Sequence, residues 1–158
     1  MANLAISRNK VINFTEYIDD YDNGGQKINN YQSTDIALSP NIIGGATINF
    51  LPVKNVELGL INKYVSKQYL DNTQNNNRVL DAFFVQDARF IYTIKKIPIA
   101  IGIPKEINLI AQVNNILNTK YEPNGYTYNY IYGGALSVNN YYFPMAGVNF
   151  MIGVNLSL

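Results

Sequence analysis

Four tyrosines spaced two residues apart, Tyr126, Tyr128, Tyr130 and Tyr132, are the residues best suited to hold a ligand. In an extended segment, this spacing places all four rings on one side of the backbone. Rigid rings offer a large contact area at low entropic cost, so the row could hold a sugar, an aromatic chelate or a porphyrin-like ligand. The alternative is a strand extension whose rings pack against a neighbouring loop.

Metal and acid–base chemistry have little support, because the sequence contains no His and no Cys. This excludes thiolate metal sites, disulfides and the usual His form of a nucleophilic triad. Residues 19–25, DDYDNGG, faintly resemble a calcium loop, but the twelfth position counted from Asp20 is Tyr31 and not a bidentate Glu. We therefore expect a solvated loop there, no metal, no cofactor and no enzyme activity.

Two further patterns have plain structural explanations. Asp81 and Asp87 are six positions apart, too far for a shared-proton pair by themselves, and fit a charge pattern with Arg89. The Gly-Gly pairs at 24–25, 44–45 and 133–134 open no helix and precede no Gly-Lys-Ser/Thr sequence. They are typical of turns or bulges and not of a phosphate-binding loop.

Composition points to a β protein with polar connections. The 158 residues are 47% hydrophobic and 15% charged, with a net charge of +1, 13 Tyr and no Trp. The balanced charge argues against a nucleic-acid partner, which requires a basic face. The length allows one domain with a modest core, or a piece of something larger.

The elements that must position these residues are six candidate strands, each with apolar residues at every second position. The clearest is the last, where Phe150, Ile152, Val154, Leu156 and Leu158 alternate with polar or small residues. Strict period two predicts a strand with one apolar face. The predicted fold is all-β, an antiparallel meander of about six long strands. They cover residues 2–6, 42–50, 56–64, 84–94, 107–113 and 149–158.

The connections alternate in length. Residues 51–55 and 97–105 are short, whereas residues 19–33, 71–78 and 123–140 are long, polar and rich in Gly and Asn. We expect the long stretches to be mobile loops. Short turns on one side and long loops on the other are typical of a transmembrane β-barrel. The longest apolar run, residues 97–104, is too short for a spanning helix.

The choice between a soluble and a membrane protein depends on what the apolar face meets. The opposite face holds Asn, Thr, Ser, Gly and few charges, which suits a wet lumen better than the Lys- and Glu-rich exterior of a soluble sheet. Aromatic residues also gather near strand ends, as in the girdles of outer-membrane barrels. The alternative is the core of a soluble sheet. These aromatic residues are Tyr64, Tyr69, Phe83, Phe84, Tyr121, Tyr141, Tyr142 and Phe143.

Six stretches, in order along the whole chain, resemble the C-terminal end of Bacteroidetes-type TonB-dependent outer-membrane receptors. They are SRNKVINFTEY (7–17), LSPN (38–41), KYVSKQYLDN (63–72), LDAFF (80–84), VNNILNTKYEPNGY (113–126) and YYFPMAGVNF (141–150). The ending is similar to the barrel-assembly signal of a final strand, with Gly153, Leu156 and Leu158 in the corresponding places. The family usually ends in Phe, so Leu158 departs from the pattern.

The resemblance implies a fold and a function. Such receptors are barrels of about 22 strands filled by an N-terminal plug, and import siderophores, cobalamin or similar ligands with energy delivered through a TonB box. Residues 1–158 correspond to the C-terminal part of the barrel, so we expect no plug, no TonB box and no transport by this chain alone. Its first residues also lack the features of a signal peptide.

These considerations give one leading interpretation and one alternative. The first is a barrel-closing segment in the cell outer membrane. Its partners are membrane lipid, the remaining barrel and plug, the barrel-assembly machinery, and the TonB complex through the missing N-terminal part. Tyr126, Tyr128, Tyr130 and Tyr132 would belong to an extracellular ligand-binding loop. The alternative is a self-contained small β-barrel, either in the outer membrane or soluble and lipid-binding.

Overall fold

The computed structural model describes residues 1–95 and 105–157, and these are all-β with mainly antiparallel sheets. No helix long and apolar enough to cross a membrane occurs in the described ranges. The strands are β1 (Ala2–Ile6), β2 (Lys10–Asp20), β3 (Gln26–Asp35), β4 (Ile42–Phe50), β5 (Val56–Val65), β6 (Gln68–Tyr69), β7 (Val79–Leu80), β8 (Phe83–Lys95), β9 (Glu106–Asn114), β10 (Asn124–Tyr132), β11 (Ala135–Phe143) and β12 (Asn149–Ser157).

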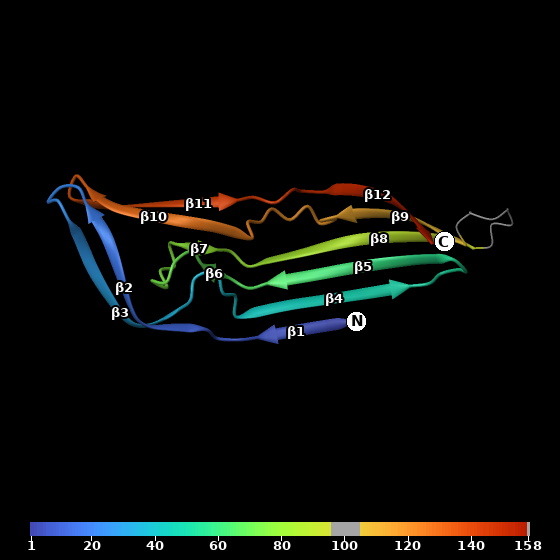
Figure 1. Cartoon of the computed structure of the whole chain (residues 1–158), viewed down its shortest axis with the longest axis horizontal. Helices are drawn as coiled ribbons and strands as arrows, with labels where there is room; N and C mark the ends of the chain where they lie inside the picture. Colours follow the sequence, from blue (N-terminus) through green and yellow to red (C-terminus); the bar gives the residue numbers. More distant parts are fainter. Residues whose placement is uncertain (96–104, 158) are drawn as a thin grey trace.

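The largest sheet contains the six strands predicted from the period-two pattern. Its order is β1-β4-β5-β8-β9-β12, and every neighbouring pair is antiparallel. Figure 1 shows these strands side by side over one half of an elongated molecule. The predicted turn at residues 97–104 lies outside the described residues. The antiparallel meander of six strands is therefore confirmed.

The structure corrects the prediction of long mobile loops at residues 19–33 and 123–140. β2 and β3 form one hairpin, and β10 and β11 form another. Gly133 and Gly134 both have positive φ (64° and 73°), so they make the two-residue turn that suits a hairpin's twist. Tyr, Thr and Ile, which favour strands, outweigh the abundant Asn and Gly in these segments.

The two hairpins join into a four-stranded sheet, the hairpin sheet, whose order is β11-β10-β2-β3. The junction between β2 and β10 is parallel and short, pairing Asp19 with Tyr130 and Asp20 with Ile131. It brings together segments more than a hundred residues apart in the sequence. Figure 1 shows this second sheet beyond the end of the six-stranded sheet, as an outward continuation of its strands.

The small buried core lies where the two sheets meet. Val65, Phe83 and Val85 pack together, and the ring of Tyr121 stacks on Phe83 with centroids 4.4 Å apart. The nearby side chain of Leu80 is only 1% exposed. The aromatic residues Phe83 and Tyr121, expected in an exposed girdle, instead belong to this core.

The segment 71–78 is a second correction, because it is partly buried, with only Asn76 and Asn77 exposed. Thr73 and Arg78 within it are buried, and Leu70 just before it is buried too. β6 and β7 flank the segment and pair with each other. The buried Arg78 side chain and its polar partners hold this segment in place, although its composition alone predicts a mobile loop.

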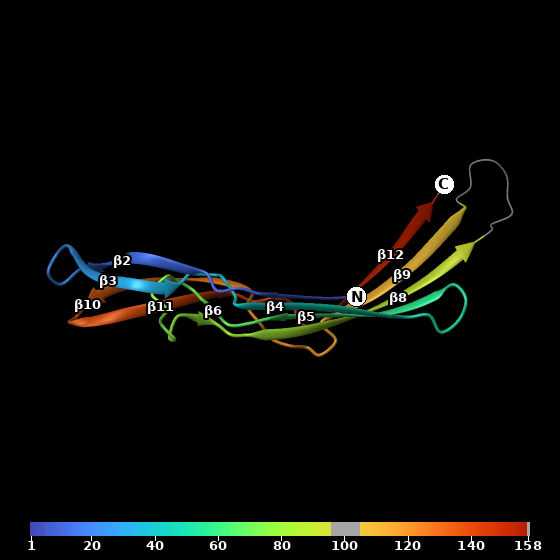
Figure 2. The same ribbon diagram turned by 90° about the horizontal axis from the view of Figure 1, so that it is seen from below.

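The six-stranded sheet stays open, and no closed barrel is formed by the described residues. Seen edge-on in Figure 2, it is one thin layer that curves along β8, β9 and β12. Such curvature follows from the right-handed twist of neighbouring strands. The layer has no second sheet or helix packed on either face along most of its length, so its faces must be considered one at a time.

The β2–β10 junction can be tested by cross-linking, because the natural chain has no Cys. Paired residues on neighbouring strands are about 5 Å apart, within reach of a disulfide. We expect Asp19→Cys combined with Tyr130→Cys to cross-link under mild oxidation, as measured by non-reducing electrophoresis. The control, Asp19→Cys with Tyr126→Cys, moves one thiol about 13 Å along β10 and should not react. Equal yields from both pairs would disprove the junction.

Candidate functional site

One face of the six-stranded sheet is apolar and uncovered. Its rows include Ile48 beside Leu60, and Leu109 beside Val154, as the register pairs them. The exposed fractions of Phe150 (78%) and Ile152 (81%) are those expected of charged surface residues, not of core residues. An exposed apolar patch across six strands marks a contact surface for a large apolar partner.

Two polar residues interrupt this face, and their side-chain amides form a hydrogen bond with each other. Asn62 on β5 and Gln86 on β8 are directly paired across the strands. The Gln86 amide nitrogen donates to the Asn62 Oδ1 at 2.6 Å, and the Asn62 amide donates to the carbonyl of Ala46 at 3.2 Å. Tyr64 and Phe84, also paired and exposed, form an aromatic rim one step farther along. The girdle interpretation of these two residues requires such exposure and stays a prediction.

The opposite face of the sheet is polar and cross-linked by side chains. Thr93 donates to Asn108 at 2.7 Å, and Asn114 donates to Asn149 at 2.8 Å. Charged residues on this face lie in loose ion pairs, Arg89 with Glu57 at 3.6 Å and Lys95 with Glu106 at 3.7 Å. Asp87 accepts a hydrogen bond from the backbone N–H of Asn115 at 2.8 Å and, as predicted, forms no dyad with Asp81. A hydrated environment suits this face.

Both outer strands of the sheet have one free edge among the described residues. β1 pairs only with β4, and β12 pairs only with β9. β12 has nine residues, all exposed, and contains Gly153 and Leu156 of the predicted assembly signal. Leu156 projects on the apolar face and Gly153 on the polar face, where a Cβ would meet open space. Leu158 lies outside the described residues.

The four predicted tyrosines all lie on β10, on the same face of the hairpin sheet. Tyr126, Tyr128 and Tyr132 are exposed, while Tyr130 is half-buried. They do not form one continuous stack. Tyr126 stacks on Tyr141 of β11 with centroids 4.9 Å apart, whereas Tyr128 and Tyr130 form a separate tilted pair at 5.7 Å.

Tyr21, which the sequence did not single out, completes the second group. Its ring meets Tyr130 edge-on at 5.8 Å, and its hydroxyl lies 3.1 Å from that of Tyr128. This hydrogen bond raises the pKa of Tyr128 above its ordinary value. The rings are therefore a strand extension packed on a neighbouring hairpin, and their outer edges and hydroxyls stay open to a ligand.

The carboxylates of residues 19–25, the segment that faintly resembles a calcium loop, accept backbone hydrogen bonds. Asp20 accepts the backbone N–H groups of Asp22 and Asn23 at 3.1 and 3.2 Å, which closes the β2–β3 turn. Asp22 accepts the N–H groups of Gly133 and Gly134 at 2.8 and 2.7 Å. Within the described ranges, no cluster of three acidic residues is placed to bind a metal.

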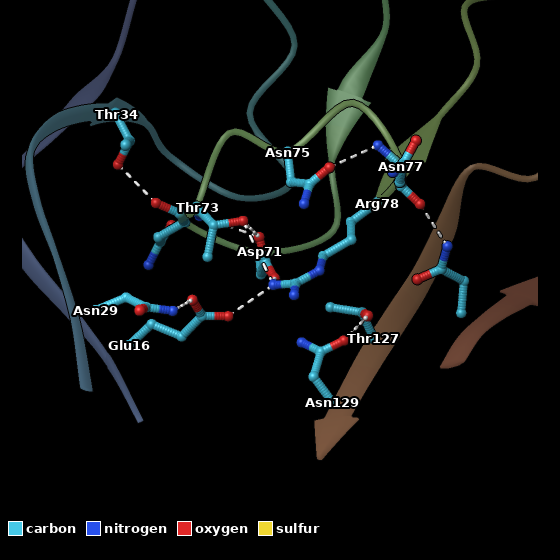
Figure 3. A network of polar contacts seen from close by, with 12 residues as sticks. Glu16, Asn29, Thr34, Asp71, Thr73, Asn75, Asn77, Arg78, Thr127 and Asn129 are labelled. Carbon is cyan, nitrogen blue, oxygen red and sulfur yellow. Dashed lines mark hydrogen bonds and ion pairs between the residues drawn. The ribbon is translucent and has the colours of Figure 1, made fainter. Parts of the chain in front are cut away.

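A buried Arg78 joins the β2–β3 hairpin to the segment 71–78 (Figure 3). The side chain is 3% exposed, and its Nη1 donates to Glu16 Oε1 and Asp71 Oδ2, each at 2.7 Å. Asn29 and Tyr31 of β3 donate to the other Glu16 oxygen at 3.1 and 2.9 Å. The sequence did not predict this cluster, whose members are separated by up to 62 positions.

The electrostatics of the cluster favour its charged form. Burial raises the pKa of Glu16, but hydrogen bonds from Arg78, Asn29 and Tyr31 outweigh it and hold the pKa below the ordinary 4.5. Burial and the bond to Glu16 raise the pKa of Tyr31. Burial opposes the charge of Arg78, but its two carboxylate partners raise the pKa of Arg78. Such an arrangement of mutually paired charges is typical of a structural ion cluster.

Comparisons with protein-family models, with curated proteins and with solved structures found no match. The resemblance drawn from the sequence stays a hypothesis. The function has to be argued from the surfaces just described: an uncovered apolar face, a polar face, two free edges and an aromatic hairpin.

Replacing Arg78 with Met should destabilise the hairpin sheet by about 3–5 kcal/mol, because Glu16 and Asp71 lose their buried counter-charge. Urea unfolding followed by proteolysis of the hairpins measures the change. Lys27→Met, which removes an exposed cation from β3, should change stability by less than about 0.5 kcal/mol. Similar losses of stability in both variants would contradict a special structural role for the Arg78 ion pairs.

Acid should loosen the same cluster. Because the pKa of Glu16 is lower in the folded state, its contribution is present above the unfolded pKa and is lost as pH falls through the folded one. We expect hairpin stability to decline below about pH 4.5. Glu16→Gln should flatten part of that decline, as measured by amide hydrogen exchange of β2 and β3 between pH 3 and pH 7 (roughly the range of carboxylate titration). An unchanged pH profile in Glu16→Gln would contradict this assignment.

Proposed function

We propose that the chain is the barrel-closing C-terminal segment of a TonB-dependent receptor in the outer membrane. The observation that carries this proposal is the uncovered apolar face of the six-stranded sheet. In a soluble protein, other parts of the protein would cover such an apolar face, whereas the outer surface of a membrane barrel meets lipid. In this proposal the segment is structural and is not an enzyme.

The dimensions of the sheet support a membrane setting. β4, β5, β9 and β12 have nine or ten residues. At about 3.3 Å per residue they extend about 30 Å, the thickness of the hydrocarbon core. Tyr64 and Phe84 stand at one end of the apolar face, where amphipathic rings meet the headgroups. The self-paired amides of Asn62 and Gln86 reduce the cost of polar groups on that surface.

The free edges of β1 and β12 favour a larger barrel. In lipid each edge would leave a row of N–H and C=O groups without partners, which costs several kcal/mol per group. In the proposal these edges pair with the remaining strands of a barrel of about 22 strands. The polar face then lines the lumen and contacts the plug, and an N-terminal TonB box links the receptor to the TonB complex.

The remaining roles follow from the same placement. The hairpin sheet extends outside the cell, where Tyr126, Tyr128, Tyr130 and Tyr132 contribute to binding a siderophore, cobalamin or a similar ligand. Gly153 and Leu156 on β12, together with Leu158 in the sequence after it, are the segment's contribution to recognition by the barrel-assembly machinery. The ligand itself depends on loops and a plug beyond these residues.

The second candidate, a self-contained small β-barrel, needs the sheet to close on itself. The observed sheet is open, with β1 and β12 at opposite edges. The proposed receptor segment requires such an open sheet, so the observed topology favours it over the small barrel.

The decisive experiment is an immunoblot of outer-membrane fractions from cells that make the protein, using an antibody against residues 126–140. We expect a band in the outer membrane well above the 17.8 kDa of this chain. A membrane-bound band at 17.8 kDa would favour the small barrel, and a soluble band would reject both forms of membrane protein.

Neighbouring residues on β12 test which face meets lipid. Val154→Arg places a charge on the apolar face and should cost about 2–4 kcal/mol, lowering the amount of protein in the outer membrane. Asn155→Arg, at the same depth on the polar face, should leave that amount near the wild-type level. Quantitative blotting of membrane fractions compares the two variants. A greater loss from Asn155→Arg would mean that the faces are assigned the wrong way round.

A further inference from the structure

The chain contains two Asn-Gly sequences that the proposed function does not use, Asn23-Gly24 and Asn124-Gly125. An Asn followed by Gly is chemically labile, because the next backbone nitrogen can attack the side-chain amide without hindrance from a Cβ. Both sites are in hairpin segments, and both Asn residues are exposed to the water that completes the reaction. Their local geometry differs in a way that ranks their reactivity.

At Asn124 the reacting groups are already in contact. The backbone N–H of Gly125 donates to the Oδ1 of Asn124 at 2.8 Å. Because that oxygen is bonded to Cγ, the nitrogen is held close to Cγ, about 3–3.5 Å for such a contact, which is the separation of a near-attack conformer. Asn124 is the first residue of β10 and is exposed, so water can reach its side chain, whereas Gly125 after it is buried.

At Asn23 the same groups are bound elsewhere. The backbone N–H of Gly24, which would be the nucleophile, donates to the carbonyl of Asp20 at 3.0 Å. The leaving amide of Asn23 donates to Asp20 Oδ2, also at 3.0 Å. Both groups would have to break these bonds before reacting, and the turn would have to open.

We propose that Asn124 is a site of spontaneous deamidation, favoured over Asn23 by the fold. The Gly125 nitrogen forms a bond to Asn124 Cγ and loses its proton. The Cγ–Nδ2 bond breaks, and Nδ2 leaves as ammonia after taking up a proton. Water then opens the cyclic imide at either carbonyl, giving aspartate or isoaspartate. No oxidant or reductant is required.

The isoaspartate product would change the aromatic hairpin. It adds a methylene to the backbone at the start of β10, where Asn124 pairs with Phe143. The next residue has no room to adjust, since a Cβ on Gly125 would lie 2.5 Å from the carbonyl oxygen of Tyr141. The shift would disturb the stacking of Tyr126 on Tyr141. Deamidation at Asn124 would therefore change the arrangement of the tyrosine rings on the hairpin sheet.

The test is peptide mapping of the natural full-length protein after incubation at mildly alkaline pH in heavy-oxygen water. Incorporated heavy oxygen marks deamidation that occurred during the incubation. We expect the Asn124 peptide to deamidate about tenfold or more faster than the Asn23 peptide. In denaturant the two rates should converge, because the fold no longer distinguishes them.

Two matched variants complete the test. Asn124→Gln should abolish the product at that peptide and leave the slow reaction at Asn23 unchanged. Asp20→Ala, which removes the carboxylate that binds the Asn23 amide, should accelerate Asn23 alone. Equal or faster deamidation of Asn23 in the native wild-type protein would overturn the proposal, as would a ratio that persists unchanged in denaturant.

Discussion

Alternation along the six long strands places their apolar side chains on one face, and no other part of the described chain covers that face. A single layer cannot bury two surfaces by itself, so its stability depends on what lies against it. The buried core is accordingly small, and its main cluster is Val65, Phe83 and Val85 with the partly buried Tyr121 against it. In the proposed membrane setting, hydrocarbon on one face and water on the other would supply the environment that a second layer normally provides.

The hairpin sheet depends on polar interactions and not on an apolar face. It extends beyond the apolar band, where water competes for every hydrogen bond and apolar burial is scarce. Its two hairpins meet over only two parallel residue pairs. Asp22 also joins them by accepting the N–H groups of the Gly133-Gly134 turn, and Arg78 joins the β2–β3 hairpin to Asp71 in the segment 71–78. Losing one partner of such a cluster leaves an uncompensated charge, which makes the arrangement specific as well as strong.

Much of the fold could be predicted because period two is a local property. Phe150, Ile152, Val154 and Leu156 reveal a strand and its apolar face without reference to any other segment. The hairpins at 19–33 and 123–140 were missed because Asn, Gly and Asp normally indicate loops, and short-range composition does not reveal that two polar hairpins support each other. The Arg78 cluster was missed for the same reason. Glu16 lies 62 positions from Arg78 in the sequence, and only the fold brings the two side chains together.

The sequence by itself determined the all-β class, the six strands, their apolar and polar faces, and the row of tyrosines on one side of β10, since each depends on neighbours two positions apart. Only the tertiary structure decided that the sheet stays open and that the tyrosines divide into two groups. It also showed that carboxylates of the acidic turn accept hydrogen bonds from backbone N–H groups. These features depend on contacts between residues tens of positions apart, whose energies are set by register, burial and hydrogen-bond geometry and not by local pattern.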